Sequence, residues 1–188
     1  ETGAPALYLE VNHGPILVAN NILLSGVSIA NRSRGTAFSH NLFSGRYMTL
    51  NTVRTTPYMK PHSTTLAGMH ANHTGDDRFY NNIFATPALD GRSILNEEVK
   101  QVKKNLRLAR YDDKKLPLKM DGNLYVNSAM PHEKDQNPMI LEQGTKDFKL
   151  IHREDGYYLE WTLSAAMLED HKRKLVTTEL LGNARVPK

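Results

Sequence analysis

The stretch that decides the fold is NILLSGVSIANRSRGTAFSHNLFSG, residues 21–45, in which short apolar runs alternate with asparagine and glycine. It opens on Asn21-Ile-Leu-Leu-Ser-Gly and returns 20 residues later to Asn41-Leu-Phe-Ser-Gly. Related segments begin at Asn82 and Asn123, each 41 residues after the previous one. A fixed period of about twenty residues indicates a repeat architecture.

A second match lies six or seven residues upstream of the first three asparagines, where an asparagine is followed by a glycine in residues 11–14, 30–35 and 71–75. Each unit therefore contains an apolar strand, an Asn-Gly turn, a second strand, an asparagine and a third strand. Gly and Asn tolerate the left-handed backbone that sharp corners require. The pattern predicts the coils of an all-β parallel β-helix, with asparagines hydrogen-bonded from coil to coil. An antiparallel sandwich is the alternative.

The repeat also suggests a domain organisation. We expect residues 1–138 to form the coils, interrupted near 90–117 by a helix-containing excursion in which apolar residues recur at helical spacing. Residues 139–188 contain a hairpin pattern around Asp155-Gly156. We expect them to form an antiparallel β appendage packed on the coils, and a separate domain is the alternative.

Composition excludes several classes of protein. The 188 residues are 39% apolar and 23% charged, which is typical of one or two globular domains. Basic residues are spread along the chain and the net charge is only +4, so we expect no nucleic-acid partner. The longest apolar runs are too short for a membrane span, and there are no cysteines. We expect the chain to be part of a longer polypeptide.

The first apolar strand supplies a candidate reacting group. Along residues 7–11, alternation places Leu7 and Leu9 inward and Glu10 outward. The corresponding strand of the next coil presents Ser28 and Ala30, so we expect small neighbours around Glu10. A carboxylate on such a rigid surface could act on a sugar-sized ligand. From strand alternation alone, a single outward glutamate is more often a solvated charge.

Other polar residues are weaker candidates. Asp76 follows a glycine in Asp76-Asp77-Arg78, which fits either an Asx turn or a binding site. His62 lies in a Pro-His-Ser-Thr segment, while His70 and His73 have a spacing that does not align two ligands on a strand. We therefore expect neither a metal site nor a cofactor.

Six segments, in order, resemble the β-xylosidases of glycoside hydrolase family 120: EVNHGPILVANNILL, GTAFSHNLFSG, PHSTTLAGMH, GDDRFYNNIF, DGNLYVN and KLVTTELLGNARVP. The resemblance extends over residues 7–187. It implies a right-handed parallel β-helix and a retaining enzyme that removes xylose from short xylo-oligosaccharides.

The resemblance also implies roles for individual residues. Glu10 matches the general acid/base, while the nucleophilic aspartate is expected one coil earlier, where this chain has no residues. We expect Asn12, His13, His62 and Asp76 to bind the oligosaccharide. The isolated chain is expected to hydrolyse little or nothing. We expect a homo-oligomer, or a second chain that supplies the N-terminal coils.

Two other functions remain open from the sequence. One is a non-catalytic β-helix that binds carbohydrate or has a structural role. The other is a β-helical enzyme acting on uronic-acid polymers, which is disfavoured because the scattered Lys and Arg residues give no sign of a basic cleft.

Overall fold

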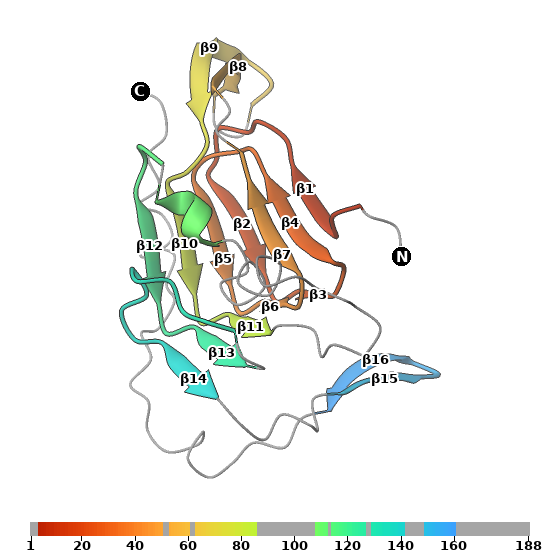
Figure 1. Cartoon of the computed structure of the whole chain (residues 1–188). Helices are drawn as coiled ribbons and strands as arrows, with labels where there is room; N and C mark the ends of the chain where they lie inside the picture. The colour runs from red at the N-terminus through yellow and green to blue at the C-terminus, as the bar shows by residue number, and fades with distance from the viewer. Residues whose placement is uncertain are drawn as a thin grey trace.

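The computed structural model describes residues 4–50, 53–60, 63–85, 108–112, 114–126, 129–141 and 149–160. Within them the chain winds through successive coils whose strands pair in parallel with those of the next coil (Figure 1). The predicted parallel β-helix is confirmed. None of the helical segments in these ranges is long and apolar enough to span a bilayer.

Three parallel sheets run along the stack of coils. The first contains β1 (Leu7–Leu9), β4 (Val27–Asn31) and β7 (Arg46–Thr49). The second contains β2 (Ile16–Ala19), β5 (Thr36–Ser39), β10 (Asp77–Tyr80) and β12 (Leu118–Asp121). The third contains β3 (Ile22–Leu23), β6 (Leu42–Phe43), β11 (Ile83–Ala85), β13 (Leu124–Val126) and β14 (Met139–Leu141). Strands β1, β2 and β3 of the first coil are each the edge of their sheet.

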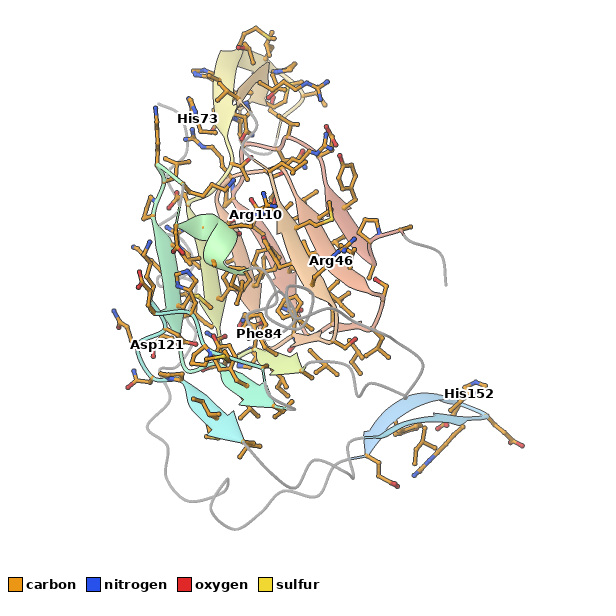
Figure 2. The ribbon with its side chains drawn as sticks, viewed as in Figure 1. Arg46, His73, Phe84, Arg110, Asp121 and His152 are labelled. Atoms are coloured by element: carbon orange, nitrogen blue, oxygen red, sulfur yellow. The ribbon has the colours of Figure 1, made fainter. Side chains whose placement is uncertain are left out.

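The coil interior is filled by residues that occupy the same position in successive coils. Phe38 and Phe79 are paired in register, and their rings stack with centroids 4.7 Å apart. Phe43, Phe84 and Tyr125 form a second column, with stacked rings 5.1 and 5.2 Å apart. These spacings match the separation of neighbouring strands, about 4.8 Å. Phe84, labelled in Figure 2, is fully buried.

The repeat asparagines form the expected ladder. Asn41 Nδ2 and the Asn41 backbone N–H both donate to Asn82 Oδ1 at 3.0 Å, and Asn82 donates in the same way to Asn123 at 3.0 and 2.9 Å. Asn21 donates likewise to Asn41. Each ladder asparagine follows a residue with positive φ, namely Asn20, His40, Asn81 and Gly122. The left-handed corner turns the chain between the second and third sheets.

Two segments leave the coil. Strands β8 (Val53–Met59) and β9 (Leu66–His73) form an antiparallel hairpin between β7 and β10, which projects from the side of the stack, beyond the ends of the strands at the top of Figure 1. The excursion expected near 90–117 contains the 3₁₀ helix η1 (Leu108–Tyr111), while residues 86–107 and 113 lie outside the described residues.

The C-terminal part departs from one expectation. Strand β14 pairs in parallel with β13, so Met139–Leu141 belongs to the coil stack and not to an antiparallel segment that begins at residue 139. Strands β15 (Lys149–Arg153) and β16 (Gly156–Glu160) form an antiparallel hairpin. Its packing on the coils stays a prediction, and residues 161–188 lie outside the described residues.

Candidate functional site

The candidate site is the turn between β1 and β2, where Glu10, Asn12 and His13 follow one another. Val11, inside this turn, is buried and has φ of +47°. A β-branched side chain is rarely found in this left-handed region, and such strain persists only where surrounding contacts hold it. The geometry of the turn therefore depends on the elements packed against it.

Hairpin β8–β9 supplies those contacts, and the sequence did not predict it. Arg54 of β8 donates to Glu10 Oε1 at 3.0 Å. The Thr56 hydroxyl lies 2.8 Å from His13 Nε2, and Asn72 Nδ2 of β9 donates to the carbonyl of Asn12 at 2.6 Å. One hairpin thus contacts all three candidate residues of this turn, although it lies more than forty residues further along the sequence.

Glu10 is exposed, and the predicted outward orientation is confirmed. Its expected small neighbours are wrong, because the register pairs Tyr8 with Ala30 and Leu9 with Asn31, which leaves Arg32 opposite Glu10. Arg32 Nη1 lies 3.9 Å from Glu10 Oε1, the same oxygen that Arg54 contacts. The observed register differs from the expected one by two residues, which keeps Glu10 outward but replaces its small neighbours with a cation.

Tyr8 completes this group of side chains. Its hydroxyl hydrogen-bonds Glu10, and this bond raises the pKa of Tyr8 above its ordinary value. The Arg32 guanidinium lies over the Tyr8 ring, 5.5 Å from its centroid. We name Tyr8, Glu10, Arg32 and Arg54 the Glu10 cluster. It joins an aromatic ring, a carboxylate and two guanidinium groups on the outer surface of the first coil.

Asn12 and His13 hold the turn. The Asn12 N–H donates to Ser33 Oγ at 2.8 Å, which links the turn to the second coil. His13 is 6% exposed, and its ring packs edge-on against Tyr58 and His70, at 5.7 and 6.3 Å between centroids. Burial lowers the pKa of His13, so the ring is neutral at neutral pH. A role of these residues in binding sugar stays a prediction.

The two other predicted site residues lie elsewhere or are not described. Asp76 is buried, has φ of +54° and forms an ion pair with the equally buried Arg78 at 3.3 Å. Arg78 also donates to the Asp76 carbonyl at 2.7 Å. These contacts favour a structural role for Asp76 inside the coil. His62 lies outside the described residues.

Asp77 was not among the predicted site residues, yet it has the most perturbed carboxyl group of the described residues. It is fully buried and accepts hydrogen bonds from Asn31 Nδ2 and the Thr36 N–H, both at 3.0 Å. The Tyr111 hydroxyl also donates to it. Burial raises the pKa of Asp77 to about 7. The sequence does carry a signal for this burial, because alternation along β10 places Asp77 on the same inward face as Phe79.

The Asp77 network is sealed inside the coil, since Tyr47, Tyr111 and Asn31 are also buried. The Tyr111 hydroxyl lies 2.8 Å from the Tyr47 hydroxyl, which accepts a hydrogen bond from Asn31 at 2.9 Å. No group of three His, Asp or Glu side chains suitable for a metal ion occurs within the described ranges. The Glu10 cluster therefore remains the accessible candidate site.

Comparison with known proteins gives one match. The chain is similar to XylC, whose structure was solved in complex with xylose, with 32% sequence identity and a TM-score of 0.63. The similarity covers 83% of this chain and 26% of XylC, so the chain spans about a quarter of the length of that protein. No protein-family model and no curated protein sequence matches the chain.

The similarity to XylC has two consequences. It supports the parallel β-helix, because the two folds superpose with a TM-score of 0.63 over most of this chain. Because it is present in sequence as well as in fold, it also supports a relationship to a protein that binds xylose.

Proposed function

We propose that this chain is part of a retaining β-xylosidase-like glycoside hydrolase that acts on short xylo-oligosaccharides. The observation that carries this proposal is the 32% identity to XylC, bound to xylose, over 83% of the chain. The exposed Glu10 supports it, because a reacting carboxylate must be accessible to the substrate.

In this proposal Glu10 is the general acid/base. In the first step a second carboxylate attacks the anomeric carbon while Glu10 transfers a proton to the departing glycosidic oxygen. In the second step the Glu10 carboxylate removes a proton from water, which attacks the same carbon and releases xylose. The anomeric configuration is therefore retained after two displacements.

The second carboxylate must lie about 5–5.5 Å from Glu10. The described contacts of Glu10 are with Tyr8, Arg32 and Arg54, none of which carries a carboxyl group. Neighbouring strands lie about 4.8 Å apart, so a carboxylate on a coil added at the outer edge of β1 would have the required separation. We propose that such a coil, in the longer polypeptide or in a second chain, supplies that carboxylate.

A non-catalytic carbohydrate-binding β-helix is the second candidate function. It is favoured by the two arginines at Glu10, because their ion pairs with this carboxylate occupy the group that the hydrolytic mechanism needs. The guanidinium N–H groups and the carboxylate oxygens can instead hydrogen-bond sugar hydroxyls.

Hydrolysis of xylobiose and 4-nitrophenyl β-xyloside tests the two candidates. The protein should be assayed as purified with any associated subunits retained. We expect Glu10→Gln to lower xylobiose hydrolysis by roughly a hundredfold or more, the usual contribution of acid/base catalysis. Glu133→Gln, at an exposed glutamate outside the cluster, is the matched control.

Azide adds a second readout, because it attacks a glycosyl-enzyme without needing a base. Recovery of aryl xyloside turnover by Glu10→Gln in azide would support the acid/base role. Near-normal hydrolysis of xylobiose by this variant would exclude it. Xylobiose binding without hydrolysis, by the wild type and both variants, would favour the binding function.

A further inference from the structure

The Glu10 cluster includes three residues to which sequence analysis gave no role. We propose that Tyr8, Arg32 and Arg54 form, together with Glu10, a surface that binds a neutral pentose unit through the Tyr8 ring and the guanidinium groups. The choice of a pentose rests on the proposed function, whereas the placement of the surface rests on the contacts below.

The exposure of the four side chains is the first argument. Tyr8 is 46% exposed, and the side chains of Arg32, Glu10 and Arg54 are 37%, 41% and 59% exposed. Ion pairs this exposed contribute little to folding, since water already solvates both partners. A large ring left half in water also contributes less hydrophobic stabilisation than a buried one. Folding therefore leaves these four side chains accessible to a ligand.

The arrangement of the four side chains is the second argument. They come from β1, from the turns that follow β1 and β4, and from hairpin β8–β9. Opposite Tyr8 in the register stands Ala30, so the neighbouring position of the second coil carries a small side chain. The hairpin is fixed to the same turn through Thr56 and Asn72, so Arg54 approaches Glu10 from a held position.

The chemistry of a pyranose complements this surface. One face of the sugar is formed by C–H groups, which pack on an aromatic ring, and hydroxyls project from its rim. A carboxylate accepts hydrogen bonds from such hydroxyls. Each guanidinium has five N–H donors, more than the contact with Glu10 uses. One glutamate and two arginines leave a single net positive charge, which does not require a charged ligand.

The chain contains a matched control for this surface. On hairpin β15–β16 the Tyr158 hydroxyl donates to Asp155 at 2.7 Å, and the Arg153 guanidinium lies over the Tyr158 ring at 4.7 Å. Tyr158 is 41% exposed. These three residues repeat the chemistry of Tyr8, Glu10 and Arg32 on another hairpin. They therefore show what an exposed tyrosine of this kind contributes to xylobiose binding when no residue equivalent to Arg54 is included.

Titration with xylobiose, followed by calorimetry and by backbone amide NMR shifts, tests the surface in the full chain. We expect Tyr8→Leu and Arg54→Ala each to weaken xylobiose binding by roughly tenfold. Tyr8→Phe keeps the ring and should weaken it less than Tyr8→Leu. Tyr158→Leu should bind like the wild type. Unchanged thermal unfolding would show that each variant still folds.

The outcomes separate this surface from the proposed reaction. Equal affinity of the wild type, Tyr8→Leu and Arg54→Ala would overturn the inference, as would no xylobiose binding by the wild type. Tighter binding of digalacturonate than of xylobiose would overturn the assignment to a neutral pentose. Loss of binding in the two variants supports the surface even if the protein hydrolyses nothing, in which case only the proposed hydrolase function fails.

Discussion

The interior of the coil and the Glu10 cluster both contain polar side chains, but they differ in what surrounds each polar group. Asn82, in the ladder, is fully buried and bonded to the coils on both sides. Arg54 and Glu10 are exposed and meet through one hydrogen bond. A buried polar group is costly unless it is paired, whereas an exposed ion pair contributes little. The interior therefore determines the fold, and the surface is available to a ligand.

The largest expected effect concerns Asp77, a fully buried carboxyl group of the interior. Burial raises its pKa from an ordinary 3.8 to about 7. Between these values the folded protein holds a proton that the unfolded chain releases, so the contribution of Asp77 to stability falls as the pH rises from about 4 to 7. The full change is roughly 4 kcal/mol.

The asparagine of the Asp77→Asn variant cannot lose a proton. The free energy of unfolding of this variant should therefore increase relative to that of the wild type as the pH rises from 4 to 7. Urea unfolding followed by circular dichroism at several pH values measures the difference. Asp155→Asn, at an exposed turn, should run parallel to the wild type. Parallel curves for Asp77→Asn and the wild type would mean that Asp77 is ionised throughout.

The asparagine ladder allows a comparison within a single structural element. Asn82→Ala leaves the Asn41 N–H and Nδ2 donors and the Phe38 carbonyl without their partner inside the coil. Unpaired buried groups cost about 1–3 kcal/mol each, so we expect Asn82→Ala to lose about 3 kcal/mol or more of unfolding free energy.

Asn21 is the matched control, because it stands at the exposed end of the same ladder. Its side chain donates to the Ala19 carbonyl and to Asn41 Oδ1, and water can replace Asn21 at both acceptors. We expect Asn21→Ala to lose less than about 1 kcal/mol. Chemical denaturation of both variants measures this, and equal losses would contradict the dependence on burial.

The same contrast explains what the sequence could predict. The ladder was predictable because Asn21, Asn41, Asn82 and Asn123 recur at one phase and each occupies the same corner. Periodicity also gave the outward orientation of Glu10. Its arginine neighbours were not predictable. Arg54 reaches Glu10 from a hairpin 44 residues away, and Arg32 does so through a strand register two residues from the expected one.

Asp77 was missed for a different reason. An acidic pair after a glycine normally indicates a solvated turn, and the sequence gave no sign that Asn31, Tyr47 and Tyr111 meet around it from three other segments. The acidic pair therefore suggested an exposed position for Asp77, whereas the alternation of side chains along β10 places it inward with Phe79. For this strand of the β-helix, the alternation was the better guide to burial.

The smallest expected effect on stability is at the Glu10 cluster. We expect Arg54→Ala to change the free energy of unfolding by less than about 1 kcal/mol, because Arg54 and Glu10 are both solvated. Urea unfolding at low and high salt measures it, and salt should reduce even this small loss, since ions screen exposed pairs. A loss as large as that of Asn82→Ala would mean that Arg54 holds hairpin β8–β9 on the coil. The Glu10 cluster would then belong to the structural framework, and the contrast with the interior would disappear.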